Sequence, residues 1–243
     1  MTDVLQLFIY IKVIQLPLVQ IDCGSGRALN YCLPTSSTCE TLKSNKTAFS
    51  QSENGIFLTI KCKGKRVTTT HSRLHVMEGQ VTDRSVICQV IEGQDAVIQT
   101  LGLGGKGDGK PTTFGSEANR LIMEEMEKAG ISRYIAISVI GAGDSLHFMP
   151  WIYRKAIMPL FMGWFQAIID DKNRMDAMIR QSNLDWTIMR CTTIKDGQAK
   201  GQVKASLDGK GLKFSITAPD MASFFVEQIA SKEFLRQSPV ISN

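Results

Sequence analysis

The stretch Gly93–Lys110, with the sequence GQDAVIQTLGLGGKGDGK, decides the fold that we predict for this chain. Its first part, Asp95–Leu101, is rich in β-prone residues and predicts a buried strand. Five of the eight residues from Gly102 to Gly109 are glycine. A strand that runs into a glycine-rich loop lets backbone N–H groups approach a phosphate or a flat cofactor ring, because no Cβ stands in the way.

Two phosphate-binding patterns overlap in this loop. Residues 102–107 match G-x-G-x-x-G, and residues 104–110 match the phosphate loop G-x-x-x-x-G-K. However, Pro111 stands where the phosphate loop needs Ser or Thr, and the helical pattern begins only near Ser116. Both motifs require a helix that starts at the last glycine. We therefore expect this loop to lie beside a bound cofactor, and we expect the turn after another strand to make most of the contacts with that cofactor. The alternative is that the loop only connects a strand to a helix.

The residues after the loop predict a helix and a second strand. Apolar residues recur at helical spacing from Ser116 to Ala129, and Gly130 suits the left-handed position after a helix. Ile131–Ser138 then predicts a buried strand. A strand, a helix and a strand in this order predict a parallel pair with a right-handed crossover.

The rest of the chain continues this alternation. Further strands are predicted at 56–61, 74–77 and 186–190, further helices at 85–91, 170–181 and 220–230, and a hairpin of two strands at 203–207 and 212–216. The alternation predicts a single α/β domain over residues 1–243 with a doubly wound, mostly parallel sheet.

The composition is that of an ordinary soluble globular protein, since 43% of the 243 residues are hydrophobic and 21% are charged. The net charge of +5 is mild and does not resemble a nucleic-acid-binding pattern, so a small anionic ligand is a sufficient explanation. The six cysteines show neither C-x-x-C spacing nor paired histidines. This argues against zinc and favours the reducing cytoplasm.

Residues 4–21 form the most apolar stretch of the chain. They lack the basic start and the small-residue cleavage site of a signal peptide. Lys12 and Pro17 interrupt them as a membrane span, so they give no firm membrane signal. Their composition favours a buried strand, with a peripheral membrane anchor as the alternative. A glycine turn, Gly24–Arg27, follows them.

A basic cluster follows the strand predicted at 56–61. It contains Lys61, Lys63, Lys65 and Arg66 within six residues. In a dinucleotide-binding fold, a positive group near the end of the second strand accommodates the 2′-phosphate of NADP. The cluster therefore favours a seat for that phosphate; a solvated surface is the alternative.

Residues 146–165, LHFMPWIYRKAIMPLFMGWF, are unusually rich in aromatic residues and methionine. Such a segment suits a wall for a flat aromatic substrate. Internal packing or the face of a homodimer is the alternative, because exposed apolar patches often mark interfaces.

Four segments carry a resemblance to a known family: GQDAVIQTLG, SRYIAISVIGAG, DDKNRMDAMIRQSNLDWTIMR and TAPDMASFF. From about Thr70 onward, the chain resembles the atypical short-chain dehydrogenases, in particular the branch of NmrA-like proteins and flavin reductase/biliverdin-IXβ reductase. The third segment is the most specific, because its helix, polar turn and strand ending in Arg recur in that order. The resemblance implies a Rossmann domain that binds NADP(H), with NAD(H) as the alternative.

The resemblance also implies positions for the site. In such relatives the nicotinamide is bordered by the end of the fourth strand, by a serine of the fifth strand and by a residue of the following helix. The residues that we assign to the cofactor are Gly24, Ser25, Gly26, Arg27, Lys61, Cys62, Lys63, Gln80, Val81, Thr100, Leu101, Gly102, Ser138, Lys172 and Arg190.

Residues 1–69 depart from the family pattern. The glycines of G-x-x-G-x-x-G fall on Gln20, Cys23 and Gly26, so only the last is present. Either the pyrophosphate site has been rebuilt, or this N-terminal portion is not the one with which the fold evolved.

The Tyr-x-x-x-Lys pair of ordinary short-chain dehydrogenases is also absent, since no tyrosine precedes a lysine by four residues. Ser138 and Lys172 are the remaining candidates for catalysis. The predicted function is NAD(P)H-dependent hydride transfer to a flavin-, quinone- or other small carbonyl-type acceptor, which needs less help with protonation. The alternative is a non-enzymatic NADP(H)-sensing regulator of the NmrA-like type, which would bind a partner protein.

Overall fold

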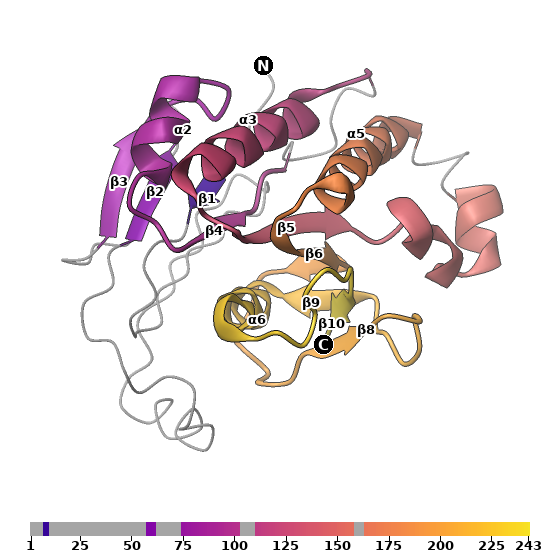
Figure 1. Ribbon diagram of the computed structural model, residues 1–243. Coiled ribbons are helices and arrows are strands. Elements are labelled where there is room, and N and C mark those ends of the chain that lie inside the picture. Colours follow the sequence, from indigo (N-terminus) through magenta and orange to yellow (C-terminus); the bar gives the residue numbers. More distant parts are fainter. Residues whose placement is uncertain (1–6, 10–56, 62–73, 103–109, 158–162) are drawn as a thin grey trace.

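The computed structural model describes residues 7–9, 57–61, 74–102, 110–157 and 163–243 (Figure 1). A five-stranded sheet forms its centre. The strands lie in the order β4 (Ala96–Gln99), β5 (Arg133–Val139), β6 (Asp185–Cys191), β10 (Val240–Ser242) and β8 (Lys204–Ser206). All neighbours are parallel except β10 and β8, which confirms the predicted mostly parallel sheet.

Three further strands form a second sheet beside this one. They lie in the order β1 (Leu7–Ile9), β2 (Phe57–Lys61) and β3 (Leu74–Glu78), and β1 also contacts β4. The pair of β2 and β3 is parallel, as expected for a doubly wound sheet, whereas β1 is antiparallel to β2. Of the long apolar stretch 4–21, only these three residues of β1 lie within the described part.

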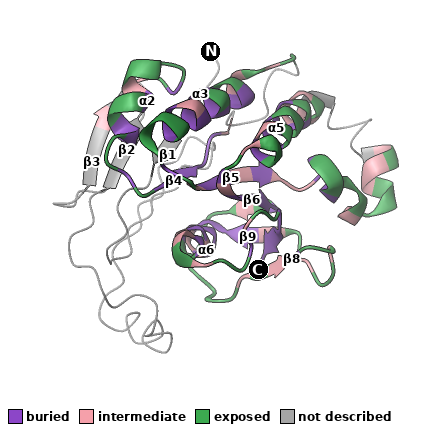
Figure 2. Ribbon diagram, in the orientation of Figure 1, coloured by how far each residue is buried: buried purple, intermediate pink, exposed green. Residues whose placement is uncertain are grey.

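Helices cover both faces of the sheet. Figure 1 shows α2 (Arg84–Ile91), α3 (Phe114–Ala129) and α5 (Gly163–Gln181) on one face and α6 (Ala218–Ala230) on the other. Alternate strand residues point to opposite faces, so Val97 packs with the first three helices and Ile98 packs with α6. Figure 2 shows the buried residues concentrated on the strands and on the helix sides that face them. The doubly wound prediction is therefore confirmed.

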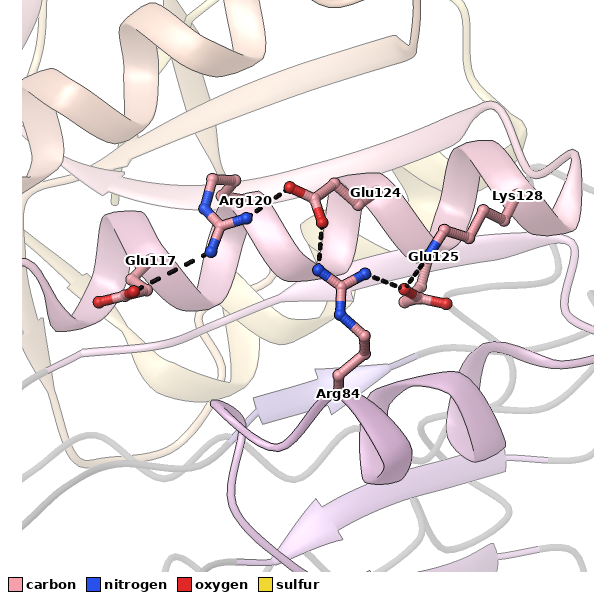
Figure 3. Close-up of polar contacts among 6 residues, drawn as sticks. All are labelled: Arg84, Glu117, Arg120, Glu124, Glu125 and Lys128. Carbon is pink, nitrogen blue, oxygen red and sulfur yellow. Dashed lines mark hydrogen bonds and ion pairs between the residues drawn. The ribbon is translucent and has the colours of Figure 1, made fainter.

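An ion-pair network joins α2 to α3 on the outer surface (Figure 3). The Arg84 guanidinium contacts both Glu124 and Glu125, and Arg120 and Lys128 complete the network along α3. Hydrogen bonds from Arg84 and Arg120 lower the pKa of Glu124, although partial burial opposes them. Lys128 and Arg84 likewise lower the pKa of Glu125, so both glutamates stay charged and fix the short helix α2 against α3.

The hairpin predicted at 203–216 is wrong. β8 pairs with β10, whereas β9 (Ser215–Thr217) pairs in parallel with β7 (Thr193–Lys195). A turn signal reports only the local reversal of the chain, and here each strand finds a partner that lies far away in the sequence. Among the described helices, none is both long and apolar enough to cross a membrane.

Helix α3 ends where the sequence predicts, at Gly130 with φ of 72°, but it begins two residues before Ser116. The reason is a cap from another helix. Asp171 of α5 accepts hydrogen bonds from the backbone N–H groups of Gly115 (2.8 Å) and Ser116 (3.1 Å). A Cβ at Gly115 would lie 2.8 Å from Asp171 Oδ2, so this close approach requires glycine. The carboxylate satisfies two N–H groups that the helix itself cannot satisfy.

We predict that Asp171→Ala destabilises the protein by about 1–2 kcal/mol, because it removes the cap and leaves buried N–H groups without partners. Urea unfolding followed by circular dichroism measures this loss. Asp170→Ala is the matched control, since Asp170 is the exposed neighbour on the same helix. Equal stability of the two variants would contradict the assigned role of Asp171.

Candidate functional site

Several buried polar atoms without hydrogen-bond partners lie near the carboxyl ends of β4, β5 and β6. Within the described part of the chain, these atoms are Gln99 Oε1, Thr100 Oγ1, Ser138 Oγ, Asp176 Oδ1 and Arg190 Nε. Buried polar groups are nearly always hydrogen-bonded, so such a group of exceptions calls for a ligand or ordered water. The carboxyl ends of the strands are also where doubly wound sheets bind their ligands.

Ser138 and Arg190 are neighbours in this group. They pair across β5 and β6, and both are buried, with exposed fractions of 0% and 1%. Arg190 Nη2 lies 2.6 Å from Asp144 Oδ1 and 3.3 Å from Asp176 Oδ2. The guanidinium of Arg190, which the sequence assigned to the cofactor, is thus engaged by two carboxylates of the chain itself.

Asp144 lies in the 3₁₀ helix η2 (Gly143–Phe148), which follows β5. Partial burial raises the pKa of Asp144, but the hydrogen bond and charge of Arg190 outweigh it, and the net pKa is lowered. Gly143 sits close to the same guanidinium, since a Cβ there would lie 2.5 Å from Arg190 Nη2. Its φ of +57° also favours glycine. The start of η2 is therefore held directly against Arg190.

Lys172 of α5 joins the ends of two strands. Its Nζ donates to the carbonyl oxygens of Leu101 (2.9 Å) and Ile137 (3.0 Å), and its side chain is buried. Burial lowers the pKa of Lys172 to about 8, although Asp176 and Asp171 oppose this shift. Lys172 thus links the end of β4 to Ile137, the neighbour of Ser138, through two backbone partners that the sequence did not reveal.

The end of β4 is not crowded by the described residues. None of them lies within 4 Å of a Cβ added at Gly102. Leu101 is a buried core residue that presents its carbonyl to Lys172, and the neighbouring Thr100 is buried with an unpartnered hydroxyl. Gln99, which sequence reasoning missed, donates to Met175 Sδ at 3.6 Å and keeps its carbonyl oxygen unpartnered.

Two residues assigned to the cofactor, Gln80 and Val81, lie just after β3. Gln80 is exposed, and Val81 is buried in the core beneath α2 and α3. Lys61 is the last residue of β2. Six more residues that the sequence assigned to the cofactor lie outside the described ranges. They are Gly24, Ser25, Gly26, Arg27, Cys62 and Lys63. Residues 103–109 of the glycine-rich loop, which carry most of both motif matches, also lie outside these ranges.

An open depression of about 410 Å³ lies between η2 and α5. Its lining consists of Gly143, Asp144, Asn173, Asp176, Ala177 and Arg180. Sequence reasoning missed Asp144, Asn173 and Asp176 as site residues. For Asp176 a signal existed, because it stands one helical turn after Lys172 and therefore on the same side of α5.

Comparison with known proteins shows the family of the chain. Residues 60–232 match a family model described as NAD(P)H-binding. The curated protein UPF0659 protein YMR090W of Saccharomyces cerevisiae is 30% identical over 148 residues. The match covers 60% of this chain and 60% of the yeast protein, so the chain spans less than two thirds of that relative.

Solved structures share the fold. chuY from Escherichia coli CFT073 has a TM-score of 0.56 at 20% identity, over 85% of this chain and 90% of that chain. ChuY from E. coli O157:H7, an anaerobilin reductase, has a TM-score of 0.55 at 25% identity, and the match covers 70% of this chain and 75% of that chain. A short-chain dehydrogenase/reductase from Veillonella parvula DSM 2008, solved in complex with NADP, has a TM-score of 0.55 at 18% identity. That match covers 71% of this chain and 74% of that chain. Because the family model spans more than half of the chain, the protein belongs to the NAD(P)H-binding family.

Proposed function

We propose that this protein is an NAD(P)H-dependent reductase that acts on a small flavin-, quinone- or other carbonyl-type acceptor. The observation that carries the proposal is the group of buried, unpartnered polar atoms at the carboxyl ends of β4 and β5. A polar ligand at this edge would supply the missing hydrogen bonds. The likeness to an anaerobilin reductase supports a reductase, because that protein shares the fold over 70% of this chain.

The described residues fit the nicotinamide half of the cofactor. The hydroxyls of Thr100 and Ser138 are free to bond a carboxamide, which has both a donor and an acceptor. Within the described part of the chain, no atom lies within 4 Å of a Cβ added at Gly102, which suits a flat ring at this strand end. When bound, the cofactor supplies the hydride. Lys172 holds the two strand ends in place, and its positive charge offsets negative charge that develops on the acceptor.

The aromatic segment 146–165 is proposed as the wall for the acceptor. Trp151 and Ile152 are 67% and 54% exposed, and Phe214, which is 71% exposed, joins them from the loop before β9. The rings of Tyr153 and Phe214 stack with centroids 6.2 Å apart. Two segments far apart in the sequence thus contribute to one apolar surface, which suits a flat acceptor. A homodimer through the same surface is the alternative proposal.

A non-enzymatic NADP(H) sensor is the second candidate function. The absence of a Tyr-x-x-x-Lys pair and the engagement of Lys172 by two backbone carbonyls favour it. A sensor would bind the dinucleotide without turning it over.

The test of the proposed function combines turnover with a variant of the strand end. We expect wild-type protein to oxidise NADPH with at least one acceptor from a flavin, quinone and carbonyl panel, at a rate proportional to protein concentration. Gly102→Val should weaken NADPH binding at least about tenfold, or about 1.4 kcal/mol. Urea unfolding of the same variant separates this loss from a loss of stability, and a Cβ at position 102 meets none of the described residues within 4 Å.

NADPH absorbance measures turnover, and cofactor fluorescence measures binding. Binding without turnover across the whole panel would replace the reductase by the sensor. Unchanged NADPH affinity in Gly102→Val would show that the cofactor does not approach this end of β4.

The basic cluster predicts a preference for NADPH over NADH. Replacing Lys61, Lys63 and Lys65 together by Ala should weaken NADPH binding by about 1–3 kcal/mol, because contacts to the 2′-phosphate are charge-assisted. NADH binding should change little. A matched control replaces three exposed lysines elsewhere, Lys195, Lys213 and Lys232. Equal losses for both cofactors in the first variant would rule out a role in 2′-phosphate recognition.

The buried position of Lys172 predicts a pH dependence of stability. Its folded pKa of about 8 lies below the ordinary value of 10.5, so between these values the unfolded chain binds more protons. Stability from this group therefore rises as the pH rises through that window, by at most about 3 kcal/mol. Lys172→Met should remove this rise, measured by urea unfolding from about pH 7 to about pH 11. Lys195→Met should keep it, and an unchanged slope in Lys172→Met would refute the prediction.

A further inference from the structure

The segment 143–157, which follows β5, carries most of the apolar surface that we propose for the acceptor. It contains η2 and the π-helix η3 (Tyr153–Ile157). Trp151 and Ile152 are 67% and 54% exposed. Among residues 143–156 the buried one is Ser145, and its hydroxyl bonds to the backbone just before the segment. Apolar burial therefore adds little to the attachment of this segment, and a few other contacts fix its position.

The far end of the segment contacts the loop between β8 and β9. The Phe148 ring lies so close to Gly209 that a Cβ added there would come within 2.7 Å of it. Tyr153 stacks on Phe214 of the same loop. That loop is itself a surface element, since Leu207 and Phe214 are 49% and 71% exposed. These contacts therefore join two surface segments to each other, and they do not by themselves fix either one to the carboxyl ends of β5 and β6.

Polar contacts hold the start of η2. Asp144 Oδ1 lies 2.6 Å from Arg190 Nη2 and 3.1 Å from Arg180 Nη2. The Gly143 N–H donates to Asn173 Oδ1 at 2.7 Å. Asp144, Asn173 and Arg180 also line the open depression between η2 and α5. Charge and hydrogen bonding thus join η2 to α5 and β6 across an open surface.

Of these contacts, the pair of Asp144 and Arg190 is the strongest. The Arg190 side chain is 1% exposed, so its charge lies in a medium of low dielectric constant, whereas Arg180 is 40% exposed and water screens its pairing. Arg190 also faces Asp176 at 3.3 Å. Loss of Asp144 leaves Arg190 with this buried counter-charge, and because Asp144 is 63% exposed, no cavity opens in the core. The sheet therefore keeps its structure without Asp144, and η2 loses its main contact.

We propose that Asp144 is a positioning residue for the acceptor. Its ion pair with Arg190 holds segment 143–157, and with it the apolar surface for the acceptor, beside the carboxyl ends of the strands. This inference rests on the proposed reductase function. The hydroxyls proposed for the nicotinamide, those of Thr100 and Ser138, lie outside the segment. Asp144 therefore governs the affinity for the acceptor, and the affinity for the cofactor and the hydride step do not depend on it.

Hydrogen–deuterium exchange tests the attachment without any ligand. In Asp144→Asn, the backbone-bonded amides of Ser145, Met149 and Tyr153 should exchange at least about tenfold faster than in wild type, as for loss of a charge-assisted hydrogen bond. The amides of α6 should keep the wild-type rate, since α6 lies on the other face of the sheet (Figure 1). The matched control Asp170→Asn, at an exposed carboxylate of α5, should leave both regions unchanged.

Kinetics test the consequence for the acceptor. With an acceptor that wild type reduces, Asp144→Asn should raise the KM for that acceptor about tenfold and leave kcat and the NADPH affinity within about threefold. A residue needed only for stability would not separate KM from kcat in this way. Asp144→Glu, which keeps the charge, should recover part of the affinity for the acceptor.

A second variant reaches the same end while both charges remain. In Gly143→Ala, the added Cβ would lie 2.5 Å from Arg190 Nη2, which pushes η2 away from the guanidinium. It should reproduce the faster exchange and the raised KM, and it decides the matter alone if Asp144→Asn does not fold.

Wild-type exchange rates in these variants would overturn the inference that the ion pair holds the segment. Faster exchange with an unchanged KM for the acceptor would overturn the role in acceptor binding. If wild type reduces no acceptor of the panel, the proposed function fails and the role in acceptor binding fails with it. The exchange rates still decide, in that case, whether Asp144 holds the segment.

Discussion

The ammonium group of Lys172 is the contact on which the site depends. By donating to the carbonyls of Leu101 and Ile137, it fixes the carboxyl ends of β4 and β5 relative to α5. The buried charge is costly in isolation, and the two backbone acceptors with nearby Asp176 and Asp171 offset part of that cost. A helix that is anchored in this way can present further polar groups to the strand ends at fixed positions.

Helix α5 uses neighbouring residues for different tasks. Asp171 caps α3 from the side, Lys172 holds the strand ends, and Asp176 meets Arg190 one turn later. The 3.6-residue period puts Lys172 and Asp176 on the same side of the helix. Stability and chemistry are therefore coupled along one helix, because a shift of α5 that disturbs the cap also moves the lysine and the carboxyl group.

Much of the fold could be predicted from the period of apolar residues. The strand at Ile131–Ser138 and the helix ending before Gly130 show this, since both depend on local pattern. Ser138 at a strand end and Lys172 on α5 came from the family resemblance, and the structure places the Lys172 ammonium group at the carbonyl of Ile137, next to Ser138. Asp144 and Asp171 could not be found in this way, because their partners are distant in the sequence. The prediction that β8 pairs with the next segment of the chain was wrong for the same reason.

The position of β10 has a consequence for the order of folding. This strand lies between β6 and β8, and among the described strands β10 is the one that joins β8 to the five-stranded sheet. Residues 204–206 are made well before residues 240–242, so β8 must wait for a strand that leaves the ribosome some 34 residues later. During synthesis, the β6–β10–β8 edge should therefore be the last part of the five-stranded sheet to close, after the β4–β5–β6 unit has formed.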